Sequence, residues 1–166
     1  MAKDKIFVTG SDGFIGSHLV EELIIQGFRV KALCQYNSFN SWGWLDSFSE
    51  DQLNKIEIVS GDIRDFNGIK SLMQGCDSVM HLAAFIKVEE SVKHPDKYFN
   101  NNFEKAKNFI NICLENNLKK FIFSSTGSVY GNTEGFTKFS EIDNTNPINP
   151  YSQSKLNLEN FLMSED

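Results

Sequence analysis

Two side chains near the end of the sequence have the types and spacing of a proton-transferring pair. Tyr151 and Lys155 are four residues apart, so on a helix they share one face. A tyrosine alone is a weak base at neutral pH, but a lysine ammonium one turn away favours the phenolate form. Such a pair can remove a proton from a hydroxyl group while a nicotinamide takes a hydride from the same carbon. Thr126 can supply a further hydroxyl that orients the substrate oxygen.

A glycine-rich turn near the start of the sequence provides context for the Tyr-x-x-x-Lys spacing, which is common by chance on protein surfaces. Gly10, Gly13 and Gly16 stand at three-residue spacing between the apolar run Ile6–Val8 and a helix-like pattern. A helix N-terminus carries unpaired N–H groups and a partial positive charge, so it can hold a diphosphate. Gly10 permits the turn, Gly13 lets a phosphate approach the backbone, and Gly16 lets the helix pack on the strand. The alternative is a turn that joins two core elements and binds nothing.

The apolar periodicity predicts five strand–helix units that position these residues. The expected strands are Ile6–Val8, Arg29–Cys34, Lys55–Ser60, Ser78–His81 and Lys120–Ser125. The expected helices are Phe14–Gln26, one beginning near Phe66, a turn at Glu89–Val92, Asp96–Asn116, and Tyr151–Met163 with Pro150 at its first position. The buried face of the first helix is expected to carry Ile15, Leu19, Leu23 and Ile24. This alternation predicts an α/β fold, a doubly wound parallel sheet with helices on both faces (the Rossmann fold), over residues 1–166.

The end of the second predicted strand leaves the choice of dinucleotide open. A Rossmann fold that binds NAD usually carries an acid there for the ribose 2′-hydroxyl, and one that binds NADP has an arginine nearby. This sequence has Cys34 and Gln35 instead, so neither dinucleotide is excluded and NAD is slightly favoured. Trp42 and Trp44, in an aromatic loop over residues 36–50, could line the adenine, although covering the edge of the core is the more common role.

Other polar or small residues follow the later strands. Asp62 can accept a hydrogen bond from an adenine amino group, and its alternative role is to cap the next helix, for which Asp65 is better placed. The small residues Ala83 and Ala84 let the backbone lie close to a cofactor, although alone they would indicate only tight packing. In the long fourth helix the residues 100–102 are all asparagine, for which solvated positions are ordinary and an inward-facing one would be notable.

Composition and charge argue against several classes of function. The net charge of -6 argues against a nucleic-acid or anionic-membrane partner, since either would require a basic face. No apolar stretch approaches the length of a membrane span. Cys34, Cys76 and Cys113 are odd in number and far apart, which is typical of reduced thiols in a cytoplasmic protein. Neither these cysteines nor the histidines have the spacing of a metal site, so we expect no metal.

Five motifs together resemble the N-terminal half of the extended short-chain dehydrogenase/reductase family, the nucleotide-sugar epimerases and dehydratases. They are TGSDGFIG at 9–16, GDIRD at 61–65, HLAA at 81–84, SSTGSVYG at 124–131 and PYSQSK at 150–155. The resemblance implies an NAD(P) cofactor, a nucleotide-sugar substrate, and catalysis by Thr126, Tyr151 and Lys155. It assigns cofactor binding to Gly10, Gly13, Phe14, Ile15, Gly16, Asp62, Ile63, Leu82, Ala83, Ala84 and Asn102, with Tyr151 and Lys155 also bonding the nicotinamide ribose.

Two parts of the sequence resemble different reactions within that family. Residues 36–46 resemble sugar 4,6-dehydratases of the kind used in legionaminic-type acid synthesis, whereas residues 84–131 resemble UDP-glucose 4-epimerases. Elimination of water across C5–C6 needs an extra acid and base, which the family's dehydratases place just after the catalytic threonine. Gly127 and Ser128 stand there and can do neither, so we expect a nucleotide-sugar 4-epimerase. The alternatives are a 4,6-dehydratase and a dinucleotide-binding module without catalysis.

The resemblance covers only the N-terminal portion of the family's length. Family members continue with further strands and a smaller domain that grips the nucleotide-sugar, so we expect this C-terminal substrate domain to be missing from residues 1–166. We therefore expect these residues alone to bind the dinucleotide weakly and to turn over poorly. The sheet edge that the missing strands would have covered favours association, and a homodimer is one expected outcome.

Overall fold

The computed structural model describes residues 3–116, 118–132 and 138–164. The chain divides into two compact units, each made of two segments. Unit 1 comprises Met1–Ala83 and Asn108–Ser124, and unit 2 comprises Ala84–Lys107 and Ser125–Asp166. The strands that the structure describes all lie in unit 1, whereas both units contain helices.

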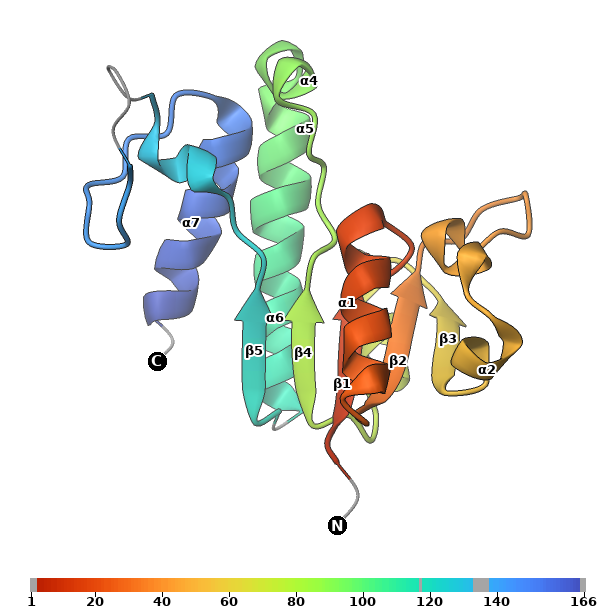
Figure 1. The fold of residues 1–166 in the computed structure, drawn as a ribbon. Helices are drawn as coiled ribbons and strands as arrows, with labels where there is room; N and C mark the ends of the chain where they lie inside the picture. Colours follow the sequence, from red (N-terminus) through yellow and green to blue (C-terminus); the bar gives the residue numbers. More distant parts are fainter. Residues whose placement is uncertain (1–2, 117, 133–137, 165–166) are drawn as a thin grey trace. The chain divides into compact units, whose positions relative to one another are not determined.

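Unit 1 is built on a parallel sheet of five strands in the order β3-β2-β1-β4-β5 (Figure 1). The strands are β1 (Lys5–Thr9), β2 (Arg29–Cys34), β3 (Ile56–Ser60), β4 (Ser78–His81) and β5 (Lys120–Phe123). The five predicted strands are thus confirmed, although β5 ends two residues early. Thr9 pairs with Leu33 of β2 and with His81 of β4, so the carboxyl ends of these strands meet at one edge. The strand order reverses there between β1 and β4, which is where α/β sheets bind their ligands.

The alternating side chains of β1 build a hydrophobic core on each face of the sheet. Ile6 and Val8 are buried against helix α1 (Phe14–Ile25). Phe7 is buried with residues of α3 (Phe66–Leu72) and α6 (Ala106–Glu115). In Figure 1 helix α1 lies in front of the sheet and α6 behind it. The predicted doubly wound sheet is therefore confirmed, because a strand that is apolar on both faces must be covered twice.

Helix α1 has nearly the predicted bounds, and its buried face includes Leu19, Leu23 and Ile24 as predicted but not Ile15. Val20, Leu23 and Ile24 are buried, whereas Ile15 is 67% exposed. The buried stripe begins at Gly16, which stands four residues before Val20 and seven before Leu23. Ile15 falls outside this stripe, so its predicted place in the core is wrong.

The aromatic loop after β2 is more regular than predicted. The sequence predicts an irregular loop over residues 36–50, but the structure has the 3₁₀ turn η1 (Gly43–Ser47) and the short helix α2 (Glu50–Leu53). Trp42 packs against the core on the α1 side of the sheet, which is the covering role expected of it. Trp44 is 54% exposed and does not cover the core.

Unit 2 is helical in the part that the structure describes. Its elements are α4 (Val88–Lys93), α5 (Pro95–Phe99), the π-helical segment η2 (Asn100–Lys105), the 3₁₀ turn η3 (Gly127–Tyr130) and α7 (Pro150–Ser164). Helix α7 packs against α4, α5, η2 and η3. The last helix therefore begins at Pro150, as predicted.

The single helix predicted over residues 96–116 is instead an α-helix, a π-helical segment and a second α-helix. The π-helical segment η2 contains Asn101 and Asn102, which are 9% and 2% exposed. A π turn closes at i→i+5 and rotates the following side chains out of the α-helical phase. The structure therefore gives the inward-facing arrangement of these asparagines and not the ordinary solvated one.

Across residues 3–116, 118–132 and 138–164 we find no helix with both the length and the apolar character needed to cross a membrane. Within the same residues no three His, Cys, Asp or Glu side chains are grouped as a metal ion would require. Cys34, Cys76 and Cys113 are free thiols.

Candidate functional site

The turn after β1 is so tight that only glycine fits at two of its positions. Gly10 has a φ of +69°, and a Cβ there would lie 2.8 Å from the backbone nitrogen of Ala83. A Cβ on Gly16 would lie 2.0 Å from the carbonyl oxygen of Gly10. These glycines therefore fix how closely α1 and the chain after β4 approach the turn.

The first turn of α1 begins without a side-chain cap. Gly13 occupies the N-cap position, where it has no side chain to accept the first N–H groups of the helix, and its own N–H donates to the Gly10 carbonyl at 3.1 Å. The next two side chains, Phe14 and Ile15, are 57% and 67% exposed. A bare glycine backbone in front of an uncapped helix start suits an anion such as a diphosphate.

Thr9 joins the ends of β1 and β4 through its hydroxyl group. The hydroxyl shares a hydrogen bond with His81 Nδ1 at 2.7 Å and accepts from the N–H groups of Leu82 and Ala83, both at 3.2 Å. Thr9 and His81 are both buried. The pair holds the predicted cofactor residues Leu82 and Ala83 beside the glycine turn. Thr9 and His81 appear in the family motifs, but no role was predicted for either, because they are 72 residues apart and their bond leaves no local pattern.

Thr9→Val removes this hydroxyl with little change in volume. We expect the free energy of unfolding to fall by about 2 kcal/mol, because the buried His81 ring nitrogen and the Ala83 N–H group each lose their hydrogen bond to this hydroxyl. Urea denaturation measures the change, and Ser71→Ala, which removes an exposed hydroxyl, should stay within about 0.5 kcal/mol of the unaltered chain. An unchanged midpoint for Thr9→Val would show that the hydroxyl does not stabilise unit 1.

Asp62, the predicted acceptor for an adenine amino group, lies between β3 and α3. Its Oδ1 accepts from the backbone N–H and from Nε of Arg64, both at 2.8 Å, and the guanidinium holds the pKa of the carboxyl below its usual range. Asp62 therefore stays ionised and can serve as an acceptor. Asp65 caps α3 by accepting from the N–H of Gly68, as predicted. Ile63 is buried in the core of unit 1, so only its backbone could meet a ligand.

In unit 2 the predicted proton-transferring pair lies in the first turns of α7. The Asn149 side chain caps this helix, since its Oδ1 accepts from the N–H of Ser152 at 2.9 Å. The half-buried Tyr151 ring meets the Tyr98 ring edge-on, with 6.5 Å between centroids. Lys155, one turn after Tyr151, is 3% exposed. A chance pair of surface residues would not bury its lysine, so the surface interpretation of this spacing is wrong.

The charge of Lys155 is sensitive to pH near neutrality. Burial lowers the pKa of Lys155 to about 8, against a smaller opposing effect from Glu159, one turn further along α7. A lysine with such a pKa is mostly charged at pH 7 and loses its proton close to the physiological range. This matches a group that takes part in proton transfer.

Asn102 connects three segments of unit 2. The N–H of Phe85 donates to Asn102 Oδ1 at 2.9 Å, and Asn102 Nδ2 donates to the Phe85 carbonyl at 2.8 Å. Nδ2 also donates to Ser154 Oγ at 3.4 Å, and Ser154 donates to the Tyr151 carbonyl at 2.6 Å. The side chain predicted to bind cofactor thus fixes the segment after Ala84 to the first turn of α7, an interaction that the sequence did not indicate.

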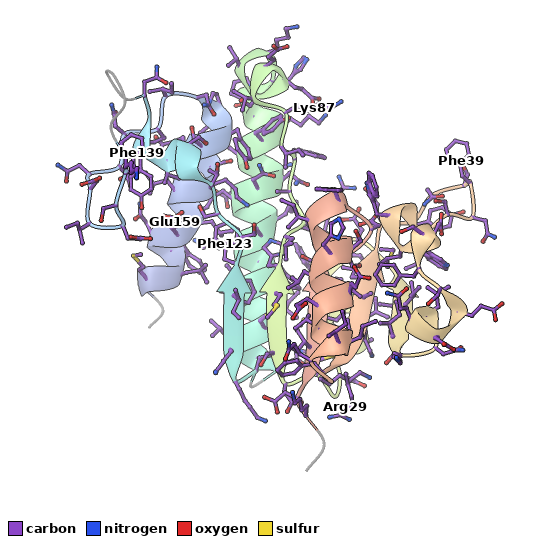
Figure 2. The ribbon with its side chains drawn as sticks, in the orientation of Figure 1. Arg29, Phe39, Lys87, Phe123, Phe139 and Glu159 are labelled. Atoms are coloured by element: carbon purple, nitrogen blue, oxygen red, sulfur yellow. The ribbon has the colours of Figure 1, made fainter. Side chains whose placement is uncertain are left out.

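The Thr126 hydroxyl, predicted to orient the substrate oxygen, is engaged at the start of η3. Its Oγ1 accepts from the Ser128 N–H at 3.2 Å and shares a hydrogen bond with Ser128 Oγ at 2.9 Å. The neighbouring Ser125 donates to the carboxylate of Glu159 on α7 (labelled in Figure 2). These contacts hold the residues around Thr126 against the helix that carries the Tyr–Lys pair.

The structure thus places the predicted residues in two groups. Unit 1 contains Gly10, Gly13, Phe14, Ile15, Gly16, Leu82 and Ala83 at the carboxyl ends of β1 and β4, and Asp62 and Ile63 after β3. Unit 2 contains Ala84, Asn102, Thr126, Tyr151 and Lys155. The predicted cofactor and catalytic functions therefore divide largely between the units.

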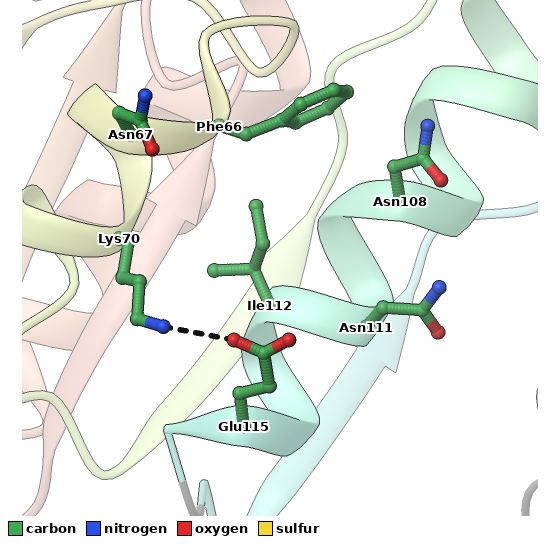
Figure 3. A pocket seen from close by; sticks show the side chains of 7 residues that line it. All are labelled: Phe66, Asn67, Lys70, Asn108, Asn111, Ile112 and Glu115. Carbon is green, nitrogen blue, oxygen red and sulfur yellow. Dashed lines mark hydrogen bonds and ion pairs between the residues drawn. The ribbon is translucent and has the colours of Figure 1, made fainter.

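A pocket of about 360 Å³ in unit 1 lies on the side of the sheet that carries α3 and α6. It is lined by Phe66, Asn67 and Lys70 of α3 and by Asn108, Asn111, Ile112 and Glu115 of α6 (Figure 3). Lys70 and Glu115 form an ion pair of 2.9 Å within this lining. No predicted site residue lines the pocket, so it carries no part of the chemistry described above.

Known proteins resemble the chain along almost its whole length. Residues 7–164 match the sequence model of the family described as GDP-mannose 4,6 dehydratase. The UDP-glucose 4-epimerase of Pisum sativum is 32% identical over 163 residues, which cover 95% of this chain and 46% of that protein.

Solved structures also resemble the chain along almost its whole length. The UDP-Glc/GlcNAc 4-epimerase from Campylobacter jejuni is 34% identical with a TM-score of 0.80, covering 97% of this chain and 48% of that one. The UDP-glucose 4-epimerase from Brucella ovis, in complex with NAD, is 30% identical with a TM-score of 0.81, covering 97% and 47%. The chain therefore spans about half the length of the relatives that it matches.

Proposed function

The chain belongs to the extended short-chain dehydrogenase/reductase family of nucleotide-sugar epimerases and dehydratases, and we propose that it acts in NAD-dependent 4-epimerisation of a nucleotide-sugar. The proposal assigns the diphosphate and adenosine of the cofactor to unit 1 and proton transfer to unit 2. The observation that carries it is the burial of Lys155, which is 3% exposed, one helical turn from Tyr151.

The glycine turn of unit 1 fits a dinucleotide. A side chain is excluded at Gly10 and Gly16, and the first turn of α1 begins at a bare Gly13. Its N–H groups would hold the diphosphate, while the ionised Asp62 would accept from the adenine amino group. When bound, the nicotinamide supplies a hydride acceptor that later returns the hydride.

The side chains of unit 2 would move the proton. Tyr151 would take the proton of the sugar C4 hydroxyl as C4 loses its hydride, with the Lys155 ammonium stabilising the phenolate and Thr126 orienting the oxygen. Return of the hydride to the opposite face of C4, and of the proton to the C4 oxygen, inverts that carbon with no net oxidation. The hydrogen bonds of Asn102 would keep the first turn of α7, and so Tyr151, in place.

The residues after Thr126 support epimerisation over dehydration. Elimination of water would need a further acid and base, yet Gly127 has no side chain and the Ser128 hydroxyl is bonded to Thr126. The family includes dehydratases, but the relatives described above are UDP-sugar 4-epimerases. UDP-glucose is therefore the first substrate to test.

Tyr151→Phe tests the proposal. We expect the interconversion of UDP-glucose and UDP-galactose, followed by chromatography over long incubations, to slow by about 100- to 10,000-fold, because the ring stays but the proton acceptor is lost. NAD affinity, measured by calorimetry, should change little. Tyr36→Phe is the matched control, since it removes a hydroxyl from a side chain that is 77% exposed.

Three other results would count against the proposal. Unchanged turnover by Tyr151→Phe would contradict the assigned base. NAD binding without turnover of any nucleotide-sugar would support the alternative of a binding module. A chain that binds no dinucleotide would contradict both.

A further inference from the structure

A carboxylate from the glycine turn lies at the end of β2, where the strand itself has no acid. Gln35 is the first residue after β2, and its N–H donates to Asp12 Oδ2 at 3.1 Å. This bond uses one oxygen of a carboxylate that has two. Asp12 thus supplies negative charge at the place where dinucleotide-binding folds usually carry an acid on the strand.

The backbone of Asp12 is also hydrogen-bonded to the loop after β2. The N–H of Trp44 donates to the Asp12 carbonyl at 3.0 Å, and the Trp44 ring meets the Phe14 ring edge-on at 5.1 Å. The glycine turn and the loop are therefore joined at both Gln35 and Trp44, which holds the carboxylate at the end of β2.

A second carboxylate adds charge of the same sign. Asp46 accepts from Ser41 Oγ at 2.6 Å and from the Trp42 N–H at 2.9 Å, and these bonds lower the pKa of its carboxyl. Burial raises the pKa of the Cys34 thiol to about 11, and the charges of Asp12 and Asp46 contribute further. Both carboxylates therefore act on the last residue of β2.

The loop offers no positive charge to balance them. No lysine or arginine occurs between Lys31 and Lys55 in the sequence. Arg64 follows β3, the strand that pairs with β2, but its guanidinium is bonded to Asp62. A 2′-phosphate at the end of β2 would meet the Asp12 carboxylate and no cation from the loop.

We propose that Asp12 makes unit 1 select NAD over NADP, by accepting a hydrogen bond from the ribose 2′-hydroxyl and repelling a 2′-phosphate. The inference rests on the proposed function, because it requires the adenosine ribose to reach the end of β2. A hydroxyl can donate to a carboxylate, whereas an ionised phosphate presents only acceptors and negative charge to it.

Asp12→Asn removes the charge and keeps an oxygen that can accept from Gln35, so the turn should keep its shape. We expect calorimetry with NAD and with NADP to show that the unaltered chain prefers NAD. In Asp12→Asn this preference should fall by about tenfold, through tighter NADP binding. Asp51→Asn, which removes an exposed carboxylate of α2, should leave the preference unchanged.

The salt dependence of binding distinguishes charge repulsion by Asp12 from a purely steric effect of its side chain. Raising the sodium chloride concentration should weaken the preference of the unaltered chain for NAD and have little effect on Asp12→Asn. An unchanged preference in a folded Asp12→Asn, checked by circular dichroism, would overturn this inference and leave the proposed function intact. A preference for NAD that is lost in Arg64→Ala but kept in Asp12→Asn would likewise overturn this inference and leave the proposed function intact. A chain that binds neither dinucleotide would remove the proposed function and this inference with it.

Discussion

Gly16→Ala is expected to lower the affinity of the chain for NAD by about 100-fold and its melting temperature by roughly 5–10 °C. The added Cβ would lie 2.0 Å from the Gly10 carbonyl oxygen. No rotamer change can relieve this contact, because one atom is a Cβ and the other belongs to the backbone. The start of α1 must therefore move away from the turn whose N–H groups would hold the diphosphate.

Gly127→Ala is the matched control for this substitution. A Cβ on Gly127 would meet no atom of the described residues within 4 Å, so both the NAD affinity and the melting temperature should stay close to those of the unaltered chain. Calorimetry and thermal denaturation measure the two quantities. Tight NAD binding by Gly16→Ala would mean that the diphosphate binds elsewhere.

Lys155→Met should have opposite effects on stability and activity. Burial lowers the pKa of Lys155 from 10.5 to about 8, so an apolar side chain at this position avoids a cost of roughly 3 kcal/mol at pH 7. The free energy of unfolding should therefore rise, while epimerisation should be lost with the ammonium that supports Tyr151. Lys93→Met, at an exposed position of α4, should change neither by much.

The protonation of Lys155 in the folded and the unfolded chain determines how the free energy of unfolding changes with pH. At pH 7 the lysine is charged in the folded and unfolded chain alike, so the full cost of burial is present. Between pH 8 and 10.5 the unfolded chain holds a proton that the folded chain has released, so the unaltered chain gains stability as the pH rises. Urea denaturation should therefore show a large difference between the two proteins at pH 7 and a small one at pH 10. A less stable Lys155→Met at pH 7 would contradict the prediction.

The sheet could be predicted from sequence because buried parallel strands leave short, continuous apolar runs. The predicted and observed bounds of β2 and β4 coincide, and the glycine spacing placed the start of α1 correctly. The exposure of Ile15 could not be predicted in this way, since the buried stripe of α1 begins at Gly16, which lies against the Gly10 carbonyl. This close approach depends on the turn and not on apolar periodicity.

The candidate site could be predicted only as a set of residue types. The burial of Lys155 and the inward turn of Asn102 depend on packing around α7 and on bonds to Phe85, which no local pattern records. The carboxylate that accepts from Gln35 at the end of β2 belongs to Asp12, which is 23 residues away in the sequence. Hydrogen bonds between such distant residues follow from the fold, so they appear only once the strands are placed.

The interleaving of the two units has a consequence for synthesis on the ribosome. Unit 1 gains its edge strand β5 only after residues 84–107, which belong to unit 2, have been made. Helices α4 and α5 and the segment η2, which lie in these residues, can pack only after α7 has been made, because α7 is the helix against which they pack. The nascent chain therefore carries an open sheet edge at β4 until β5 is made, and α4, α5 and η2 lack their packing partner until α7 is made. These are the intervals in which aggregation competes with folding.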